Sequence, residues 1–495
     1  MIKTFMCILP FIILFLTAII SVSLTYDKKK SHNISLMGFI LAIIVNSALL
    51  IFVQEEIAFN AFKTNPSSLR FSEIVLVALF LIFIALEHDL KETELNEYKY
   101  SNYLLFSSSI MGLFITDNLF ILSIFYIMSI VFLGAVYTYG DYKKRMQSMR
   151  KYFVAFTITL SLIIISNLII NYYFETLEIT KIKQIFSEQS RGLQVFFILA
   201  NIFNFGFFAG IVPIAQNYLD EYFDHSNITN LKMINCIFLP ISGFLIIKTT
   251  GFSIGLMKTE YIYFYFGAVG IVIMIIQTLR ELFGNFKTRT KSVGKIIGYY
   301  SMTEMNVYLV LTSLKGYGIY FTSSEEIFTV LIFNLFVISV FGKILLFSGL
   351  NPVLNSTTEW DLRYLGGFQK HFPKFIGFLF IIPFLYLFPG LVGYSILSTT
   401  TSVIRAETSV MPIKVSFLWI VGFLYLCYLG ITIMLQGTLL NEFYFGKPQQ
   451  HNYSKKIQSV KDNLRIYYLI SLMTVIILVV LSYYKPVLET NFLFS

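Results

Sequence analysis

Long runs of apolar residues recur along the whole chain and are separated by short polar stretches. A helix needs about 20 apolar residues to cross the hydrocarbon core of a bilayer, and about fourteen runs approach this length. They lie near residues 5–25, 33–53, 70–87, 102–117, 119–139, 152–173, 195–217, 231–249, 261–283, 295–315, 326–349, 374–400, 414–436 and 464–485. Because an unpaired backbone amide in lipid costs several kcal/mol, each run is expected to form a helix. The pattern therefore predicts an all-α, polytopic membrane protein.

Composition excludes a soluble protein and gives no sign of nucleic-acid binding. Apolar types make up 56% of the 495 residues and charged types only 13%, against about a quarter charged in soluble proteins. The net charge is 37 basic minus 28 acidic residues, or +9, but the basic residues lie between apolar runs and not on one soluble surface. Cys7, Cys236 and Cys427 fall inside apolar runs. We interpret them as small buried hydrophobic residues, and not as disulfide or metal-binding cysteines.

The sequence predicts a single transmembrane domain over residues 1–495. The first run follows Met1 without a small-residue cleavage site, so we expect a retained helix and no transit peptide. The longest loops reach only about 25 residues by the spacing of the runs, too short for a soluble catalytic domain. Phosphate-binding, zinc and nucleophile motifs are absent from the sequence. Any chemistry is therefore transport across the membrane, or it belongs to a partner.

Loop charges predict the orientation of the helices. Basic residues cluster after the first, fifth, ninth and thirteenth runs, at 28–30, 143–151, 287–295 and 447–456. All four loops fall on one side, which the positive-inside rule assigns to the cytoplasm or matrix. An acidic stretch at 87–97 falls on the same side, but acidic residues carry little topological weight. We therefore expect the N-terminus to face the opposite compartment.

A series of short motifs occurs in order between residues 102 and 486. The motifs are DNLF at 117–120, KYF at 151–153, the stretch from Gly206 to Pro213 with YLD at 218–220, KIIGYYS at 295–301, FGKILLF at 341–347, Thr358, Asp361 and LGGF at 365–368 before Pro373, FPGLVGY at 388–394, and Phe445 and Gly446 with Pro486. Together they resemble the antiporter-like family, which includes the proton-pumping membrane subunits of respiratory complex I and the large subunits of multi-subunit cation/proton antiporters. The part from 341 to 373 resembles the family most strongly, as a lysine-centred helix followed by a Thr, Asp, Gly-Gly and Pro linker.

This resemblance implies a fold of about fourteen helices, with two helices interrupted near Pro213 and Pro389 and three N-terminal helices (5–87) before the family-like core (102–486). It implies a membrane-arm subunit of NADH:ubiquinone oxidoreductase, most like chain 4, because chain 5 normally continues into a long lateral helix. The expected partners are chain 2-like and chain 5-like neighbours and lipids such as cardiolipin. NAD, FMN, iron–sulfur clusters and ubiquinone would lie in partner subunits, with no cofactor in this chain. The expected location is the mitochondrial inner membrane or, alternatively, a bacterial or archaeal plasma membrane.

Three ionisable residues inside the predicted helices are candidate proton-relay groups. A charge in mid-membrane costs at least about 2.5–3.5 kcal/mol, so its retention indicates a pathway, a partner or an edge position. Lys343 lies centrally in its run, where the resemblance places a connecting lysine, and either lines an internal hydrated cavity or extends to the interface. Lys248 is either a second relay group or an interfacial anchor. Glu304 either pairs with a lysine or is a hydrated carboxylate at the interface.

Other positions depart from the family pattern and leave the function open. Without gaps, the family's channel charges fall on apolar residues, namely Ile127, Phe208, Leu239 and Leu397. None of these side chains can carry a proton. The chain is therefore a proton-conducting subunit that uses other residues, a scaffold that has lost transport, or a subunit of a cation/proton antiporter that is not linked to NADH.

Three further charged residues are expected to have structural roles. We interpret Lys295 as an interface charge, and Asp220 and Glu221 as capping groups beside the Pro213 break.

Overall fold

The computed structural model of the 495-residue chain describes most of its residues. The described residues are 2–53, 57–59, 62–64, 66–89, 98–135, 142–211, 216–225, 228–253, 260–283, 292–318, 324–356, 361–362, 365–387, 415–446 and 454–483. Pro213, Pro389 and Leu397 lie outside these residues, as do the side chains of Cys7 and Glu221.

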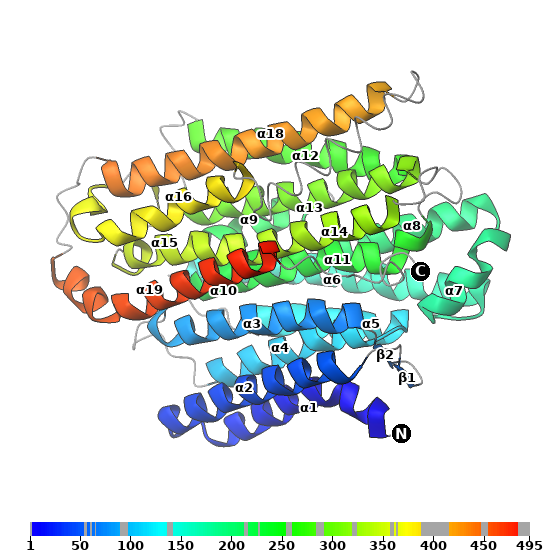
Figure 1. The fold of residues 1–495 in the computed structure, drawn as a ribbon, viewed down its shortest axis with the longest axis horizontal. Helices are drawn as coiled ribbons and strands as arrows, with labels where there is room; N and C mark the ends of the chain where they lie inside the picture. Colours follow the sequence, from blue (N-terminus) through cyan, green and yellow to red (C-terminus); the bar gives the residue numbers. More distant parts are fainter. Residues whose placement is uncertain are drawn as a thin grey trace.

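The chain folds into long helices that lie side by side, with their axes roughly horizontal in Figure 1. In chain order the α-helices are α1 (Ile2–Ser23), α2 (Lys28–Phe52), α3 (Pro66–Asp89), α4 (Lys99–Ile115), α5 (Leu119–Ala135), α6 (Tyr142–Phe174), α7 (Ile179–Ile185), α8 (Arg191–Gly206), α9 (Gln216–His225), α10 (Ile228–Lys232), α11 (Leu239–Thr250), α12 (Glu260–Phe283), α13 (Val293–Gly318), α14 (Ser324–Val337), α15 (Lys343–Ser356), α16 (Pro373–Leu387), α18 (Val415–Leu440) and α19 (Ser454–Tyr483). Short 3₁₀ turns are η2 (Phe186–Glu188), η5 (Gly251–Ser253) and η8 (Phe368–Lys370). Each of the fourteen predicted runs contains a helix, so the all-α membrane fold is confirmed.

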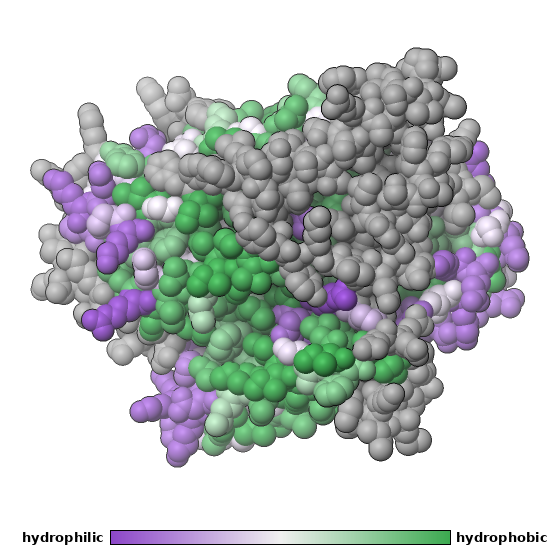
Figure 2. Space-filling model, viewed as in Figure 1, coloured by the Kyte–Doolittle hydropathy of each residue, from purple (hydrophilic) through white to green (hydrophobic). Residues whose placement is uncertain are grey.

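The surface has the distribution of polarity that a membrane requires. Figure 2 shows apolar residues across the middle of one face and hydrophilic residues gathered at its left and right ends, where the helices of Figure 1 end. Within the described residues, eight helices are long and apolar enough to cross a bilayer. Exposed isoleucine, leucine and phenylalanine side chains on helices such as α2, α6 and α19 face outward, where lipid replaces water.

Three π-helical segments are built into the helices. They are η4 (Met233–Phe238), η6 (Ile338–Gly342) and η9 (Asn441–Phe445). Segment η4 joins α10 to α11, and η6 joins α14 to α15, so each of these helices continues through a wider turn. A π turn inserts one residue into the α-helical ladder and often marks a functional position. The periodicity of an entirely apolar run does not reveal such an insertion.

The seventh predicted run is not one continuous helix. α8 ends at Gly206, where the carbonyl oxygen accepts a hydrogen bond of 3.0 Å from the backbone N–H of Ile211. Gly210 in this turn has a φ of 73°, a left-handed conformation that glycine adopts without strain. α9 begins at Gln216. α16 ends at Leu387, directly before the second predicted break.

Several elements were not predicted from the hydrophobic runs. α6 begins at Tyr142, well before its apolar run, because a helix extends past the lipid when its outer turns are polar and solvated. The short amphipathic α7 lies in the loop after α6. A hairpin of β1 (Ile57–Phe59) and β2 (Phe62–Thr64) pairs antiparallel between α2 and α3. These elements lie in stretches whose hydropathy pattern is too short to specify a period.

One contiguous cluster of buried apolar side chains runs from Leu14 to Leu478 and joins the N-terminal helices to the C-terminal ones. Outside the membrane, Asp27 caps α2 by accepting a hydrogen bond of 3.2 Å from the backbone N–H of Lys30. This hydrogen bond and the nearby Lys30 ammonium lower the pKa of the Asp27 carboxyl below its usual value.

Candidate functional site

The centre of the helix bundle holds a buried ion pair between Lys343 and Glu304. Glu304 lies on α13, and Lys343 is the first residue of α15, directly after the π-helical segment η6. The ammonium of Lys343 pairs with Oε2 of Glu304, and the two side chains are 3% and 1% exposed. Lys343 therefore does not extend to the interface. The sequence analysis expected either a pairing of Glu304 with a lysine or a hydrated carboxylate at the interface. The structure shows the pairing with a lysine.

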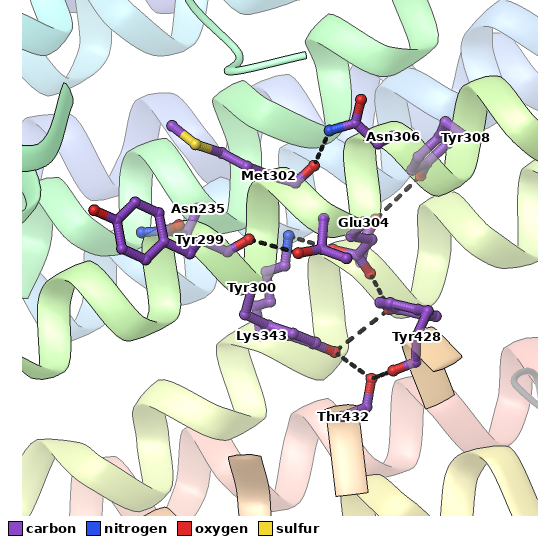
Figure 3. Close-up of polar contacts among 12 residues, drawn as sticks. Asn235, Tyr299, Tyr300, Met302, Glu304, Asn306, Tyr308, Lys343, Tyr428 and Thr432 are labelled. Carbon is purple, nitrogen blue, oxygen red and sulfur yellow. Dashed lines mark hydrogen bonds and ion pairs between the residues drawn. The ribbon is translucent and has the colours of Figure 1, made fainter. Parts of the chain in front are cut away.

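A group of hydroxyls surrounds the other oxygen of Glu304 (Figure 3). The hydroxyl of Tyr428 on α18 donates to Glu304 Oε1 at 3.2 Å. Tyr300 lies one turn before Glu304 on α13, and its hydroxyl is 3.4 Å from that of Tyr428. Thr432 Oγ1 lies 3.5 Å from the Tyr300 hydroxyl. Because each hydroxyl can both donate and accept, these contacts connect Thr432 and Tyr300 through the Tyr428 hydroxyl to the carboxylate of Glu304.

The side chain one turn before Lys343 is also hydrogen-bonded. Ser339 lies in η6, and its Oγ is 3.0 Å from the hydroxyl of Tyr308, one turn after Glu304 on α13. The contact couples the π-helical turn to α13 one turn away from Glu304.

Lys232 is a second buried cation that the sequence analysis missed. It ends α10 directly before the π-helical segment η4, and its side chain is 3% exposed. With its amide oxygen turned toward Lys232, Asn351 on α15 accepts a hydrogen bond of 2.6 Å from the lysine ammonium. The sequence placed Lys232 at the edge of its apolar run, and only the rotation of the helix directs it inward.

Lys248 has a different environment, at the end of a neighbouring helix. Its ammonium donates to three backbone carbonyl oxygens, those of Leu113 at 2.8 Å, Phe114 at 3.3 Å and Thr116 at 2.8 Å. These carbonyls end α4, whose last turn has no intrahelical donors for them. A cation is also favoured at the negative end of the helix dipole. Lys248 therefore fastens the C-terminus of α4 to α11, and it is separate from the central ion pair.

The remaining predicted charges lie together where α9 meets the start of α13. The Tyr299 hydroxyl donates to Asp220 Oδ1 at 2.6 Å, and Lys295 pairs with Asp224 at 3.1 Å. Both members of the Lys295–Asp224 pair are 19% exposed. Asp220 therefore accepts a hydrogen bond from a side chain of α13. The sequence analysis had expected it to cap the helix break near Pro213. Lys295 is a boundary charge with a fixed partner.

Three of the apolar residues on which the sequence analysis expected channel charges lie within the described part of the chain, and they have ordinary packing roles. Ile127 lines a groove of about 300 Å³ between α5 and α6, which is mainly apolar and of a size for a lipid acyl chain. Its neighbour Tyr126 faces inward instead, and donates to the carbonyl oxygen of Phe205 at 2.9 Å. Phe208 and Leu239 are fully buried. These apolar side chains pack within the bundle or along its surface groove, and none of them can carry a proton.

The arrangement supports proton transfer and offers no site for a metal among the described residues. No group of three or more histidine, cysteine, aspartate or glutamate side chains that could hold a metal ion occurs in this part of the chain.

The Lys343–Glu304 pair has two states without net charge. One is an ion pair and the other is a neutral amine beside a carboxylic acid, and the movement of one proton converts one state into the other. In a low-dielectric interior, the balance between such states depends strongly on hydration and neighbouring charges.

Neither family models nor curated proteins match the sequence. Among solved structures, the chain is similar to a chain of respiratory complex I from Thermus thermophilus with bound Aureothin, with a TM-score of 0.70 over 96% of this chain and 98% of that one. The two chains share a fold. Because only 12% of the aligned residues are identical, the likeness establishes the architecture and leaves the activity to be argued from the residues.

Proposed function

We propose that this chain is a membrane-arm subunit of proton-pumping NADH:ubiquinone oxidoreductase, in which the Lys343–Glu304 pair transfers protons. The observation that carries the proposal is this buried ion pair, set in a fold shared end to end with a chain of respiratory complex I. The motif order further supports a chain 4-type subunit of the mitochondrial inner membrane. NAD, FMN, iron–sulfur clusters and ubiquinone would then act in other subunits.

In this proposal the proton moves between Nζ of Lys343 and Oε2 of Glu304. The hydroxyl of Tyr428 donates to Glu304 and stabilises its charged form. When the proton passes to Glu304, both groups become neutral, which lowers the cost of holding them away from water. A change in hydration or in a neighbouring charge, driven by redox chemistry elsewhere, would shift the pair between these states. Lys232 is a further buried cation, and it is hydrogen-bonded to Asn351 on the helix that begins with Lys343.

Purification of the native membrane assembly tests the identity of the chain. We expect the chain to comigrate with NADH dehydrogenase activity when membranes are solubilised in mild detergent and separated on a native gel. If the chain migrates apart from this activity and gives sodium-dependent proton flux in vesicles, it belongs instead to a cation/proton antiporter.

Replacement of Lys343 tests its role in proton transfer. In the intact assembly, Lys343→Met is expected to lower the number of protons pumped per electron, because Glu304 loses the group with which it exchanges a proton. The matched control is Lys181→Met, which removes a lysine that is 60% exposed on α7. Native gels of both variants establish that the assembly is intact before pumping is compared.

A scaffold without transport is the second candidate function. It is favoured by the apolar Ile127, Phe208 and Leu239 at positions where the family carries charges. Unchanged proton stoichiometry in an assembled Lys343→Met variant would support the scaffold and contradict the relay.

A further inference from the structure

One face of α18 carries a row of buried polar side chains. Helix α18 belongs to the membrane-spanning segment from Ile420 to Phe445 and is otherwise largely apolar. The row consists of Tyr428, Thr432 and Gln436, which follow one another at intervals of four residues. This spacing places them on the same side of the helix, over about 12 Å of its length. All three side chains are buried, so the row faces the interior of the bundle.

The first part of this row is connected to the carboxylate of Glu304. The hydroxyl of Tyr428 donates to Glu304 Oε1 at 3.2 Å. The Tyr300 hydroxyl is 3.4 Å from the Tyr428 hydroxyl and 3.5 Å from Thr432 Oγ1, and Figure 3 shows these contacts in sequence from Glu304 to Thr432. Two of the distances exceed the usual O–H···O separation of about 2.7–2.8 Å. Transfer of a proton along them therefore requires a small approach of the side chains.

Gln436 continues the row one turn beyond Thr432. Its side chain is 3% exposed, and its amide oxygen has no hydrogen-bond partner among the described residues. A polar group that is buried without a hydrogen bond is costly, and a buried water commonly supplies the missing bond. The side chains of residues four apart on a helix are neighbours. A water between Gln436 and Thr432 would therefore have two polar partners, which is enough to hold it in place.

We propose that Tyr428, Tyr300, Thr432 and Gln436, with a water held between the last two, carry protons to Glu304 from the end of the bundle at which α18 terminates. The proposal rests on the proton transfer between Lys343 and Glu304 proposed above. The chain that follows α18 contains the basic stretch at 447–456. The path therefore leads from the surface that the positive-inside rule assigns to the cytoplasm or matrix.

Each hydroxyl in this path accepts one proton and releases its own. A proton from the water joins Thr432 Oγ1, and the proton of Thr432 passes to the Tyr300 hydroxyl. The proton of Tyr300 then passes to Tyr428, and the proton of Tyr428 passes to Glu304 Oε1. After the step every hydroxyl is neutral again, and the carboxyl group of Glu304 holds one additional proton. The reverse rotation of the hydroxyls restores the starting arrangement.

Replacement of the Thr432 hydroxyl is the first test. In the intact assembly, Thr432→Val is expected to lower the number of protons pumped per electron to that of Lys343→Met, while Thr432→Ser keeps the hydroxyl and should pump like the wild type. The matched control is Thr438→Val on the same helix. Thr438 donates to the carbonyl oxygen of Met434 at 2.9 Å, as Thr432 does to that of Tyr428 at 2.9 Å, but it lies outside the row and is partly exposed. This control should pump like the wild type.

Wild-type pumping by an assembled Thr432→Val variant would overturn the path. If Lys343→Met lowers pumping in a parallel preparation, the proposed function stands and only the path along α18 is wrong. If Lys343→Met also pumps like the wild type, the proposed function fails as well. A loss of pumping in Thr432→Ser equal to that in Thr432→Val would show that packing, and not the hydroxyl, matters at this position, and it would also overturn the path.

A high-resolution density map of the unaltered native assembly is the second test and does not depend on pumping. We expect a water within hydrogen-bond distance of both the Gln436 amide and the Thr432 hydroxyl. A map without water at this position, or with the Gln436 amide bonded to a side chain of another subunit, would remove the link between the two residues and overturn the proposal.

Discussion

Lys343 and Glu304 show how a charge is tolerated in the centre of this bundle. Each charge alone would cost several kcal/mol to remove from water, and their attraction in a low-dielectric interior offsets that cost only if the geometry is close. The Tyr428 hydroxyl supplies one further hydrogen bond to the carboxylate. Such a pair adds little net stability compared with apolar residues. Stability therefore does not explain the pair, which agrees with the role in proton transfer that we propose for it.

A double-mutant cycle separates the pair from its surroundings. Lys343→Met alone leaves Glu304 charged and buried, and is expected to destabilise the protein by about 3–5 kcal/mol. The double variant with Lys343→Met and Glu304→Leu removes both charges and is expected to recover most of that loss. Thermal unfolding of the detergent-solubilised protein measures both effects. If the double variant is less stable than the wild type by the sum of the losses of Lys343→Met and Glu304→Leu measured singly, the two residues do not form the pair described.

At the scale of the helix, ends and π-helical turns determine which residues meet. Segments η4 and η6 each insert a wider turn beside a buried lysine, Lys232 before η4 and Lys343 after η6. An inserted residue rotates everything that follows it around the helix axis by about 100°. Segment η6 thereby sets the direction of Lys343, which follows it directly.

Lys248 gives the prediction that belongs to this scale. Lys248→Met removes the donor to three carbonyl oxygens at the end of α4 and is expected to cost about 1.5–3 kcal/mol, the range for hydrogen bonds to charged groups. Thermal unfolding in detergent measures the loss, and Lys248→Arg should restore part of it. Proton stoichiometry of the assembled variant should stay unchanged. A fall in pumping without a loss of stability would instead identify Lys248 as a relay group.

At the scale of the whole molecule, an apolar belt lies between two hydrophilic ends. In Figure 1, the turn between α1 and α2 lies at the left end of the helices and α7 lies at the right end. Lys30 at the start of α2 is 71% exposed and Lys181 on α7 is 60% exposed. The two lysines are therefore markers for opposite membrane surfaces.

Cysteine labelling tests this orientation. In a background without the three native cysteines, Lys30→Cys is expected to react with a membrane-impermeant maleimide from the cytoplasmic or matrix side, because the positive-inside rule places the basic loops there. Lys181→Cys should react only from the opposite side. Labelling of both positions from one side would contradict the arrangement of the helices.

The sequence alone determined the membrane class, the largely helical content and the approximate position of the long apolar helices. These follow from the apolar runs, because a chain in lipid must satisfy its backbone hydrogen bonds internally and a helix does so within one segment. The motif order also indicated Lys343, Lys248 and Glu304 as residues of interest. The runs did not contain the hairpin at 57–64 or the amphipathic α7, since neither depends on burial in lipid.

Only the tertiary structure decided what each charge does. Glu304 meets Lys343, Lys248 caps α4, and Lys232 turns inward. Hydropathy is an average over a run and contains no information on rotation. The partner of a side chain depends on the angle at which its helix faces the next one, and a single π turn changes that angle. Contacts between distant helices arise from packing the whole bundle at once.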